Sequence, residues 1–321
     1  MIDDFLSDKN LDLANFWLKR SRKHHPACSD VWAWLHDYPS RKAEFVNAFR
    51  REEFYLSPMR CIHGQGRSCV IWSAQDAWAL RALTQVLESQ RSLLISEAVS
   101  HIRREPGTLT NEMRLINSVA RQSQFVCRTD IRGFYANIPK ITLLDWCWQQ
   151  RFPSPIFRLL QQYIYYQVED GGIINTSPSG IPRATGLSNF LTAAVFYQLD
   201  ESLSQRDSIF YRRYMDDFLM FSQTRWPIRR AIKRLHKTLT HWDLTLHPEK
   251  TYIGRTSKGF DWMGFQWQGG QWQGASPRSL EKSYQKRRAL VTFYGADSAR
   301  VAEYDKHYQR WVKSAEKYNS G

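Results

Sequence analysis

Apolar residues recur at helical spacing through the first 54 residues of the chain. One group contains Leu11, Phe16 and Trp17, and a second contains Trp34 and Phe45, each set among charged residues. An apolar stripe with this period is typical of amphipathic helices. The pattern predicts a helical N-terminal extension over residues 1–54.

Short apolar runs around turn residues predict strands farther along the chain. Residues 55–71 flank Gly64-Gln65-Gly66 and are expected to form a basic hairpin, and residues 260–272 are expected to form an aromatic hairpin that turns at Gly269-Gly270. Residues 209–221 indicate a strand, a tight acidic turn and a second strand. Residues 125–130 form a short apolar strand that ends in a carboxylate.

Helical patterns separate these strands. We expect helices over residues 74–100, over 141–167 with an interruption at Pro153 and Pro155, and over 187–203. Residues 227–242 predict a basic amphipathic helix, and residues 276–321 predict two charged helices that break near Gly295. Residues 103–110 are expected to be a loop, and residues 169–180 a loop or hairpin. The order of elements is that of a mixed α+β protein.

Composition adds a strong positive charge to this picture. The 321 residues include 45 Lys and Arg against 31 Asp and Glu, a net charge of +14, with 42% hydrophobic and 14% aromatic residues. The chain can bury a sizeable core, and its charge favours a polyanionic partner because bound cations release counterions from phosphates. A basic surface kept for solubility is the alternative.

The sequence carries no signal for a membrane or an oxidising compartment. No apolar run approaches the roughly 18 to 20 residues of a membrane span, and the acidic start lacks the basic and apolar regions of a secretory signal. The five cysteines are widely spaced and without a C-x-x-C pair, which argues against a disulfide framework and against a structural zinc site. We expect a cytoplasmic protein without a membrane partner.

The most specific chemical feature is Asp216-Asp217 at the turn of an apolar hairpin. Two adjacent carboxylates repel each other and lose hydration there, unless a cation binds them. Asp130, at the end of the strand over residues 125–130, supplies a third carboxylate. Three carboxylates from two adjacent strand ends can hold two Mg²⁺ ions for in-line nucleotidyl transfer. Taken singly, the pair also fits a solvated turn, and Asp130 a helix cap or an ion-pair partner.

Five segments resemble, in order and spacing, the palm motifs of reverse transcriptases. They are residues 130–138 (DIRGFYANI), 180–189 (GIPRATGLSN), 214–217 (YMDD), 246–251 (LHPEKT) and 262–265 (WMGF). Residues 58–83 resemble the fingers of the same family, so the resemblance covers about residues 55–270. It implies a right-hand polymerase with fingers, an antiparallel palm sheet carrying the aspartates and a small helical thumb.

The resemblance assigns roles residue by residue. Asp130, Asp216 and Asp217 match the metal ligands, with the Ile131 carbonyl as a further ligand. Phe134 and Tyr135 match the nucleotide site, where the Tyr135 ring would exclude a 2′-hydroxyl, although core packing is its alternative role.

Basic residues and a hairpin complete the implied site. Arg67 matches the fingers arginine that grips the triphosphate, and Lys250 the lysine near the leaving pyrophosphate, although Lys250 also fits a surface position. Trp262, Met263 and Gly264 match the hairpin that grips the primer.

One motif departs from the family pattern. Where most reverse transcriptases have Pro-Gln-Gly, this chain has Pro182-Arg183-Ala184. Arg183 replaces a neutral amide by a fixed charge near the triphosphate, which predicts either a tighter anionic grip with less base readout or a restricted product. In this substitution the chain resembles bacterial reverse transcriptases of the defence-associated and unknown groups more than retroviral or group II intron enzymes.

These observations lead to one domain scheme and one function. We expect a helical extension over residues 1–54, fingers over 55–124, a palm over 125–270 with part of the fingers at 140–180, and a thumb over 271–321. The basic and aromatic thumb suits a nucleic-acid duplex, or a two-helix cap with a solvated face. The implied enzyme is an RNA-directed DNA polymerase that uses two Mg²⁺ ions, with Mn²⁺ as a substitute.

The implied partners are an RNA template, dNTPs and the DNA product duplex. The template would be a structured non-coding RNA in bacterial anti-phage defence, and the primer a 3′-hydroxyl or a protein hydroxyl. A protein partner or a homo-oligomer stays open.

Three alternatives remain at this point. The chain could be a template-independent or protein-templated nucleotidyl transferase, or a non-catalytic RNA-binding palm scaffold. Diversity-generating, retron and intron-type roles also stay open within the reverse transcriptases.

Overall fold

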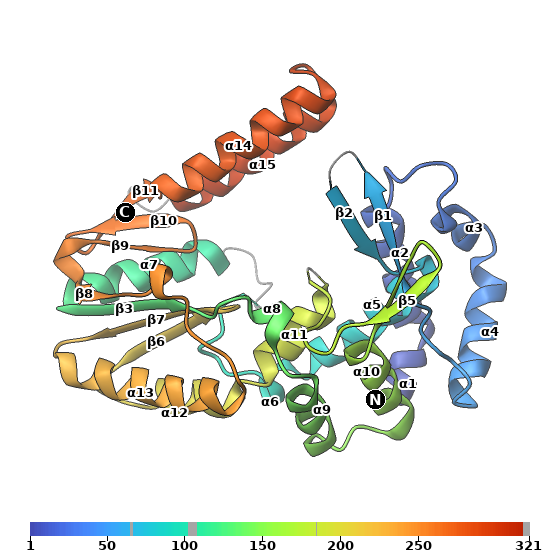
Figure 1. Ribbon diagram of the computed structural model, residues 1–321, viewed down its shortest axis with the longest axis horizontal. Coiled ribbons are helices and arrows are strands. Elements are labelled where there is room, and N and C mark those ends of the chain that lie inside the picture. Colours follow the sequence, from blue (N-terminus) through green and yellow to red (C-terminus); the bar gives the residue numbers. More distant parts are fainter. Residues whose placement is uncertain (65–66, 102–107, 184, 317–321) are drawn as a thin grey trace. The chain divides into compact units, whose positions relative to one another are not determined.

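The computed structural model describes residues 1–64, 67–101, 108–183 and 185–316 (Figure 1). The chain forms two compact units, each assembled from separate segments. Unit 1 contains Met1–Ser96, Gly133–Tyr197 and Trp242–Leu244, and unit 2 contains Glu97–Arg132, Gln198–His241 and Thr245–Gly321.

Unit 1 begins with the predicted helical extension. The helices are α1 (Ile2–Leu6), α2 (Asp8–Ser21), α3 (Asp30–His36) and α4 (Tyr38–Arg50), followed after the first hairpin by α5 (Ala74–Ser89) and α6 (Arg91–Leu94). Their apolar faces meet in an aromatic core in which Trp78 of α5 packs against Trp34 and Phe45. The helices predicted over residues 1–54 are confirmed, although Phe16 and Trp17, which belong to the predicted apolar pattern, are exposed. The helix predicted over 74–100 ends earlier than expected, at Leu94.

The sheet of unit 1 joins two hairpins. The strands are β1 (Met59–Gly64), β2 (Arg67–Ile71), β4 (Gln167–Asp170) and β5 (Ile173–Thr176), in the order β2-β1-β4-β5. β1 pairs antiparallel with β2, and parallel with β4 over the short register Met59↔Val168 and Arg60↔Glu169. Both predicted hairpins are confirmed, whereas the expected turn at Gln65-Gly66 lies outside the described residues.

The remaining helices of unit 1 follow Asp130 in the chain. They are α8 (Phe134–Asn137), α9 (Lys140–Gln149), α10 (Ser154–Ile164) and α11 (Gly186–Ala194), and α12 (Tyr197–Ser204) begins at the end of this unit. The single helix expected over 187–203 is therefore two helices. The chain turns at Val195 and Phe196, which lets the Phe196 ring pack between Phe134 and Trp242.

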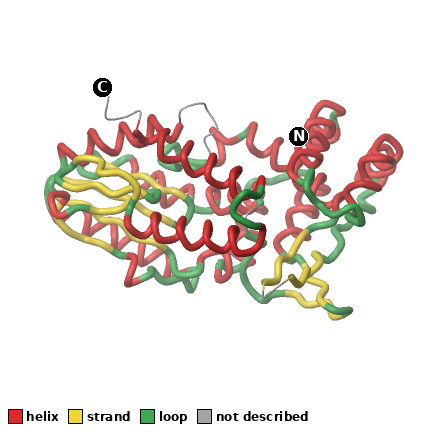
Figure 2. The backbone as a smooth tube through the Cα atoms, turned by 90° about the horizontal axis from the view of Figure 1, so that it is seen from above, coloured by secondary structure: helices red, strands yellow, loops and turns green. Residues whose placement is uncertain are grey.

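The larger sheet of unit 2 is fully antiparallel. It contains β3 (Phe125–Asp130), β6 (Phe210–Tyr214), β7 (Asp217–Ser222) and β8 (Tyr252–Arg255), in the order β6-β7-β3-β8. Figures 1 and 2 show helices running beside these strands, and α13 (Arg225–His241) packs against β3 and β7. The predicted strand–turn–strand and the basic amphipathic helix are both confirmed.

A second sheet and a helix pack on the larger sheet of unit 2 and form an apolar core with it. The strands are β9 (Phe260–Trp262), β10 (Phe265–Gln268) and β11 (Gln271–Ala275), and the helix is α7 (Thr108–Gln122). Buried residues of all four elements join Val126, Leu219 and Phe221 in one apolar cluster. The turn at Gly269-Gly270 is confirmed, but β9 adds a third strand that the hairpin interpretation did not include.

The sequence reading missed α7. Its buried residues Met113, Ile116 and Ala120 have helical spacing, and the partly buried Leu109 and Val119 extend the same apolar face. The amphipathic pattern was therefore present in the sequence, and this face packs in the cluster with the aromatic sheet β9–β11.

The chain ends in a helical hairpin, as the sequence predicts. It contains α14 (Pro277–Tyr294) and α15 (Ala299–Glu316), separated near Gly295. The Trp311 ring stacks on Phe265 at 4.3 Å between ring centroids, which attaches α15 to the three-stranded sheet. Two 3₁₀ turns, η1 (Pro248–Lys250) and η2 (Thr256–Lys258), flank β8. Among the described residues, no helix is both long and apolar enough to cross a membrane.

Candidate active site

The β6–β7 hairpin places Asp216 and Asp217 at its turn. Tyr214 pairs with Asp217, so Met215 and Asp216 form a two-residue turn. Met215 has a φ of 55°, a left-handed conformation that is uncommon outside glycine. Two contacts hold it there: its N–H donates to His101 Nδ1 at 2.9 Å, and its carbonyl accepts from Arg213 Nη1 at 3.0 Å. The conformation that presents the two aspartates is therefore fixed by side chains from within unit 2.

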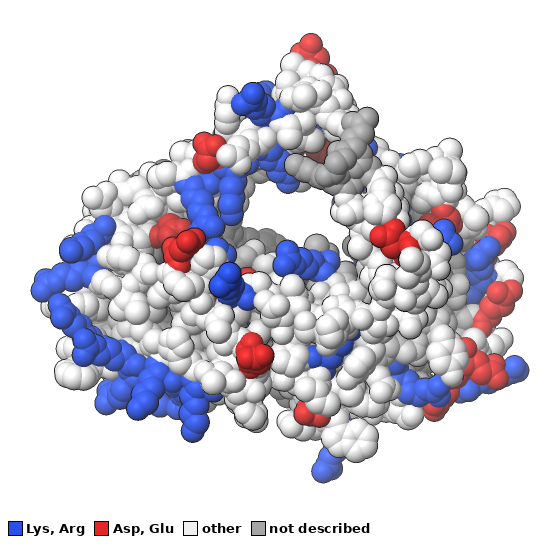
Figure 3. Space-filling model, in the orientation of Figure 1, with Lys and Arg blue, Asp and Glu red and all other residues white. Residues whose placement is uncertain are grey.

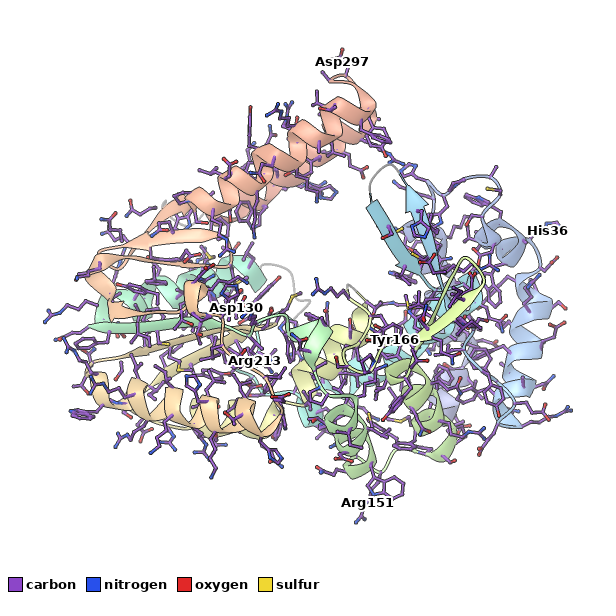
Figure 4. All side chains as sticks on the ribbon, in the orientation of Figure 1. His36, Asp130, Arg151, Tyr166, Arg213 and Asp297 are labelled. Carbon is purple, nitrogen blue, oxygen red and sulfur yellow. The ribbon has the colours of Figure 1, made fainter. Side chains whose placement is uncertain are left out.

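A buried ion pair lies behind this turn. Arg213 and Asp200 both have no exposed side-chain surface, and Arg213 Nε donates to Asp200 Oδ1 at 2.9 Å. Tyr211 donates its hydroxyl to the same oxygen at 2.6 Å. The guanidinium thus connects a buried carboxylate with the Met215 carbonyl. Figure 4 labels Arg213 on β6 and Asp130 on β3. The sequence motifs did not predict a role for Arg213.

Asp130 lies opposite Asp217 across the β3–β7 ladder. This register brings the two strand ends together, as the sequence predicts. Burial raises the pKa of Asp217 to about 7, and the negative charges of Asp130 and Asp216 act in the same direction. Arg128 and Lys250 oppose the shift. The structure therefore gathers the three predicted carboxylates at one end of the sheet.

Lys250 lies directly on Asp130. Its Nζ is 2.9 and 3.0 Å from the two Asp130 carboxylate oxygens. The backbone positions this segment, because the His247 N–H donates to the Asp130 carbonyl at 2.7 Å and Leu246 forms a bridge with Ile131. Lys250 is therefore held at the carboxylate Asp130, and its predicted role near the leaving pyrophosphate stays a prediction.

Arg128 is a second cation that the sequence reading missed. Its Nη2 lies 3.6 Å from Asp217 Oδ1 and 3.4 Å from Asp261 Oδ2, and its Nη1 donates to the Lys250 carbonyl at 3.1 Å. Arg128 precedes Asp130 by two residues in β3, so both side chains lie on the same face of the sheet. The alternation of side chains along β3 could therefore have predicted that Arg128 lies near the carboxylates.

The carboxylates offer the donor atoms that a divalent metal ion prefers, although the oxygens of the three aspartates do not all lie within 4.8 Å of one another. Asp217 Oδ1 is buried without a hydrogen-bond partner among the described residues, and a cation already spans both oxygens of Asp130. Hard divalent cations prefer carboxylate oxygens and relieve their mutual repulsion. Asp130, Asp216 and Asp217 would hold such an ion. Ile131 is buried beside them, with its N–H donating to the Asp216 carbonyl at 3.2 Å.

Tyr135 and Asn189 meet in unit 1. The Tyr135 hydroxyl donates to Asn189 Oδ1 at 3.0 Å. Asn189 lies in the first turn of α11, which Thr185 caps by accepting a hydrogen bond from the Ser188 N–H at 3.0 Å. Gly180 has a φ of +79°, and a Cβ there would lie 2.6 Å from the Tyr135 carbonyl oxygen, so only glycine permits this close approach.

The other residues of the predicted nucleotide site belong to unit 1 as well. Phe134 is buried and contacts Tyr135 and Phe196, so its ring is part of the core. Arg183 is exposed. The backbone of Arg67 begins β2, where it pairs with Gly64, and its side chain lies outside the described atoms.

The predicted primer-grip residues form the β9–β10 turn. Trp262 is buried in the core, Met263 has a φ of 50°, and Gly264 has a φ of +84°. A Cβ on Gly264 would lie 2.8 Å from Ser279 Oγ and 2.9 Å from the Trp311 ring. The glycine therefore also permits close packing of the terminal helices on this turn.

The sheet of unit 1 contains a cluster of potential metal ligands that the spacing of the cysteines did not predict. Cys61, His63 and Asp170 have potential ligand atoms within 4.8 Å of one another, and His63 Nε2 lies 2.7 Å from Asp170 Oδ1. Neighbouring strands bring these residues together, which linear spacing does not reveal. His63 and Asp170 are exposed and pair with each other, so the contacts are those of a surface hydrogen-bonded cluster.

An antiparallel sheet with three carboxylates at one end, two of them in a tight turn, defines the palm of a nucleotide-transferring polymerase. Comparison with known families identifies the type. Residues 74–267 match the family model described as reverse transcriptase (RNA-dependent DNA polymerase), and the chain belongs to this family.

Solved structures show a broader likeness. An apo telomerase from Candida tropicalis, truncated from its C-terminal domain, aligns with a TM-score of 0.49 and 10% identity over 65% of this chain and 52% of that chain. A second structure of apo telomerase from the same organism aligns with a TM-score of 0.49 and 9% identity over 66% and 46%. This chain spans about half the length of those chains. No curated protein matches the sequence.

Proposed function

We propose that the chain is an RNA-directed DNA polymerase that adds deoxynucleoside monophosphates to a primer hydroxyl by two-metal catalysis. The observation that carries this proposal is the group of three carboxylates at the end of the palm sheet, where Asp217 Oδ1 is buried and accepts no hydrogen bond from the residues that the structure describes. Membership of the reverse transcriptase family supports RNA as template and deoxynucleotides as substrates.

The carboxylates and Lys250 would have different roles in the reaction. Asp130, Asp216 and Asp217 would hold two Mg²⁺ ions, with Mn²⁺ as a substitute. When bound, the ions lower the pKa of the attacking hydroxyl and neutralise charge on the triphosphate. The primer hydroxyl gives its proton to water, its oxygen forms a bond to the α-phosphorus, and the bond from that phosphorus to pyrophosphate breaks. Lys250, held at Asp130, would give a proton to the pyrophosphate oxygen.

The residues of unit 1 would select the nucleotide. The Tyr135 ring, oriented by its hydrogen bond to Asn189, would exclude a 2′-hydroxyl. Arg67 and Arg183 would contact the triphosphate, since guanidinium groups match phosphate oxygens. The backbone at Phe134 and the turn at Met263-Gly264 would contact nucleotide and primer, respectively.

The biological role is proposed from the sequence. The exchange of the usual Pro-Gln-Gly for Pro182-Arg183-Ala184 favours a restricted template, such as a cognate structured non-coding RNA in bacterial anti-phage defence. In that role the enzyme would work in the cytoplasm, on its own or with a protein partner or a second copy.

The direct test is primer extension on an RNA template with four dNTPs and Mg²⁺, followed by sequencing of the product. We expect a product complementary to the template from the wild type, and none from Asp216→Ala/Asp217→Ala. A product without complementarity would contradict templated synthesis and indicate a template-independent or protein-templated transferase. RNA binding without synthesis on several RNA templates and primers, including a protein hydroxyl, would indicate a palm scaffold.

A further inference from the structure

Helix α13 carries cations along one face and no acidic residue. Figure 3 shows Lys and Arg gathered over this helix. The exposed cations are Arg225, Arg229, Arg230, Lys233, Arg234 and Lys237. The opposite face is apolar and buried against the palm sheet through residues such as Ile228 and Leu235. The cations therefore face solvent on one side of the sheet.

The spacing of these cations is unfavourable for an isolated helix. Arg225, Arg229, Lys233 and Lys237 follow one another at four-residue intervals, so like charges lie beside each other on successive turns. None of them forms an ion pair with a carboxylate among the described residues. Repulsion of this kind is relieved when a polyanion binds along the row.

A pocket continues the basic row onto the palm sheet. It has a volume of about 440 Å³, and the cations Arg225, Arg229, Arg255 and Lys258 line it together with Phe125. None of the described residues that line this pocket is a carboxylate. Arg225 and Arg255 both lie over the Phe125 ring, with their guanidinium carbons 5.3 and 5.9 Å from the ring centroid. Cations are thus concentrated around an apolar floor large enough for one phosphate and its sugar.

Exposed aromatic surface accompanies the charge. The side chain of Trp226, at the start of α13, is 67% exposed, and Arg229 lies over its ring at 5.2 Å. Aromatic faces beside cations suit unpaired bases, which stack while phosphates meet the guanidinium groups. A solvated charged face kept only for solubility has no need of an exposed indole.

We propose that this basic face, here called the α13 surface, binds the phosphate backbone of RNA outside the catalytic site. The α13 surface consists of the six α13 cations together with Arg255 and Lys258. Phe125 and Asp130 stand at opposite ends of β3, about 17 Å apart along an extended strand. The bound RNA segment is therefore separate from the primer terminus at the carboxylates.

The choice of RNA rests on the proposed function, because a reverse transcriptase must retain its template molecule during synthesis. A second contact on the same RNA raises the effective concentration of the template at the catalytic site. Such a contact favours long structured RNAs over short oligonucleotides.

The test is equilibrium binding of fluorescein-labelled transfer RNA to the full chain, measured by anisotropy over a range of KCl concentrations in EDTA. The test variant is Arg225→Gln/Arg229→Gln/Arg255→Gln. The matched control is Lys19→Gln/Lys23→Gln/Arg50→Gln, which removes the same charge from exposed positions of unit 1. Equal melting temperatures establish that the variants are folded.

We expect the test variant to raise the Kd at least about tenfold and to reduce the slope of log K against log[KCl] by about 2 to 3, since each lost phosphate contact removes about 0.7 to 0.9. The control should stay within about twofold of the wild type. Equal losses in both variants, or no loss in the test variant, would overturn the proposal. So would loss of binding to anionic phosphatidylserine vesicles with RNA binding intact.

The measurement uses neither dNTPs nor metal ions. Its outcome is therefore independent of whether the chain polymerises, and failure of either proposal can be recognised separately.

Discussion

At the scale of single residues, the palm carboxylates oppose stability and favour cation binding. Burial and two neighbouring negative charges raise the pKa of Asp217 to about 7, while Arg128 and Lys250 only partly compensate. A divalent ion at this position would relieve the repulsion and bind the Asp217 oxygen, which pairs with Arg128 but accepts no hydrogen bond among the described residues. The same arrangement that weakens the metal-free fold prepares the site for its proposed cofactor.

Tyr135 offers a test of nucleotide selection. Tyr135→Ala removes the ring that would exclude a 2′-hydroxyl, so we expect the ratio of dNTP to rNTP incorporation to fall at least about tenfold. Tyr135→Phe keeps the ring and removes only the hydrogen bond to Asn189, and it should retain most of the selectivity. Single-nucleotide incorporation with each substrate measures both ratios. An unchanged ratio in Tyr135→Ala would contradict the assignment.

Arg128 is expected to tune the carboxylate site without touching substrate. Arg128→Gln removes the charge beside Asp217 and Asp261, and we expect activity to fall about 10- to 100-fold, as for residues that orient metal ligands. Titration of activity with Mg²⁺ should show a changed half-saturating concentration. Wild-type activity and metal dependence in this variant would exclude a positioning role.

At the scale of elements, the β6–β7 hairpin depends on the buried pair Arg213–Asp200. Arg213→Met leaves Asp200 buried and unpaired, so we expect a loss of about 3–5 kcal/mol in the free energy of unfolding. Urea denaturation measures this loss.

The double variant Arg213→Met/Asp200→Leu is the matched control for that pair. It removes both charges and should recover a large part of the lost stability, because no unpaired charge remains. The single variant Asp200→Leu completes the comparison. If the stability lost in the double variant equals the sum of the losses in Arg213→Met and Asp200→Leu, the two residues are not coupled.

Helix α5 carries a pH-dependent element. Burial raises the pKa of Asp76 to about 6 from 3.8, although Ser73 and Ser57 donate hydrogen bonds to it. The folded state binds the Asp76 proton more tightly than the unfolded state does. Protonation of Asp76 therefore stabilises the fold fully below about pH 4, and this stabilisation disappears as the pH rises through 6. We expect wild type to lose about 2 kcal/mol relative to Asp76→Asn between pH 4 and pH 7.

Urea unfolding of both proteins at several pH values measures this difference. A constant difference across the range would show that the pKa of Asp76 is not raised in the folded state.

Elements with strong periodicity or clear turn residues were predictable from sequence. The β6–β7 hairpin, α13 and the terminal helical hairpin each have a regular apolar pattern or a glycine at the break. The helix α7 has apolar residues at helical spacing over its whole length, so the sequence carried its signal and the prediction overlooked it. The break between α11 and α12 depends on burial of Phe196, which linear pattern does not reveal.

At the scale of the whole molecule, the two units are built from interleaved segments. The chain passes from unit 1 to unit 2 and back repeatedly, and motifs that are consecutive in sequence alternate between them. Asp130 and Tyr135 are separated by five residues but belong to different units. Contacts distant in sequence hold each unit together, so composition along the chain shows no linker.

The predicted site depends on different kinds of information. The three aspartates and Lys250 could be found because their motifs are local in sequence. Arg128, Arg213 and Asp200 could not, since their roles come from strand register and burial. The net charge of +14 predicted a polyanionic partner but not where that partner binds. In the structure, eight Lys and Arg side chains lie together on the α13 surface.

The central claim is that the three palm carboxylates catalyse nucleotidyl transfer. The most direct measurement is single-turnover incorporation of one dNTP on a primed RNA template, comparing wild type with Asp217→Asn. Asp207→Asn, an exposed substitution in the same unit, is the control. We expect Mg²⁺-dependent incorporation by wild type and control, and loss of more than about a hundredfold in Asp217→Asn with an unchanged fold. Incorporation by folded Asp217→Asn at the wild-type rate would contradict the account.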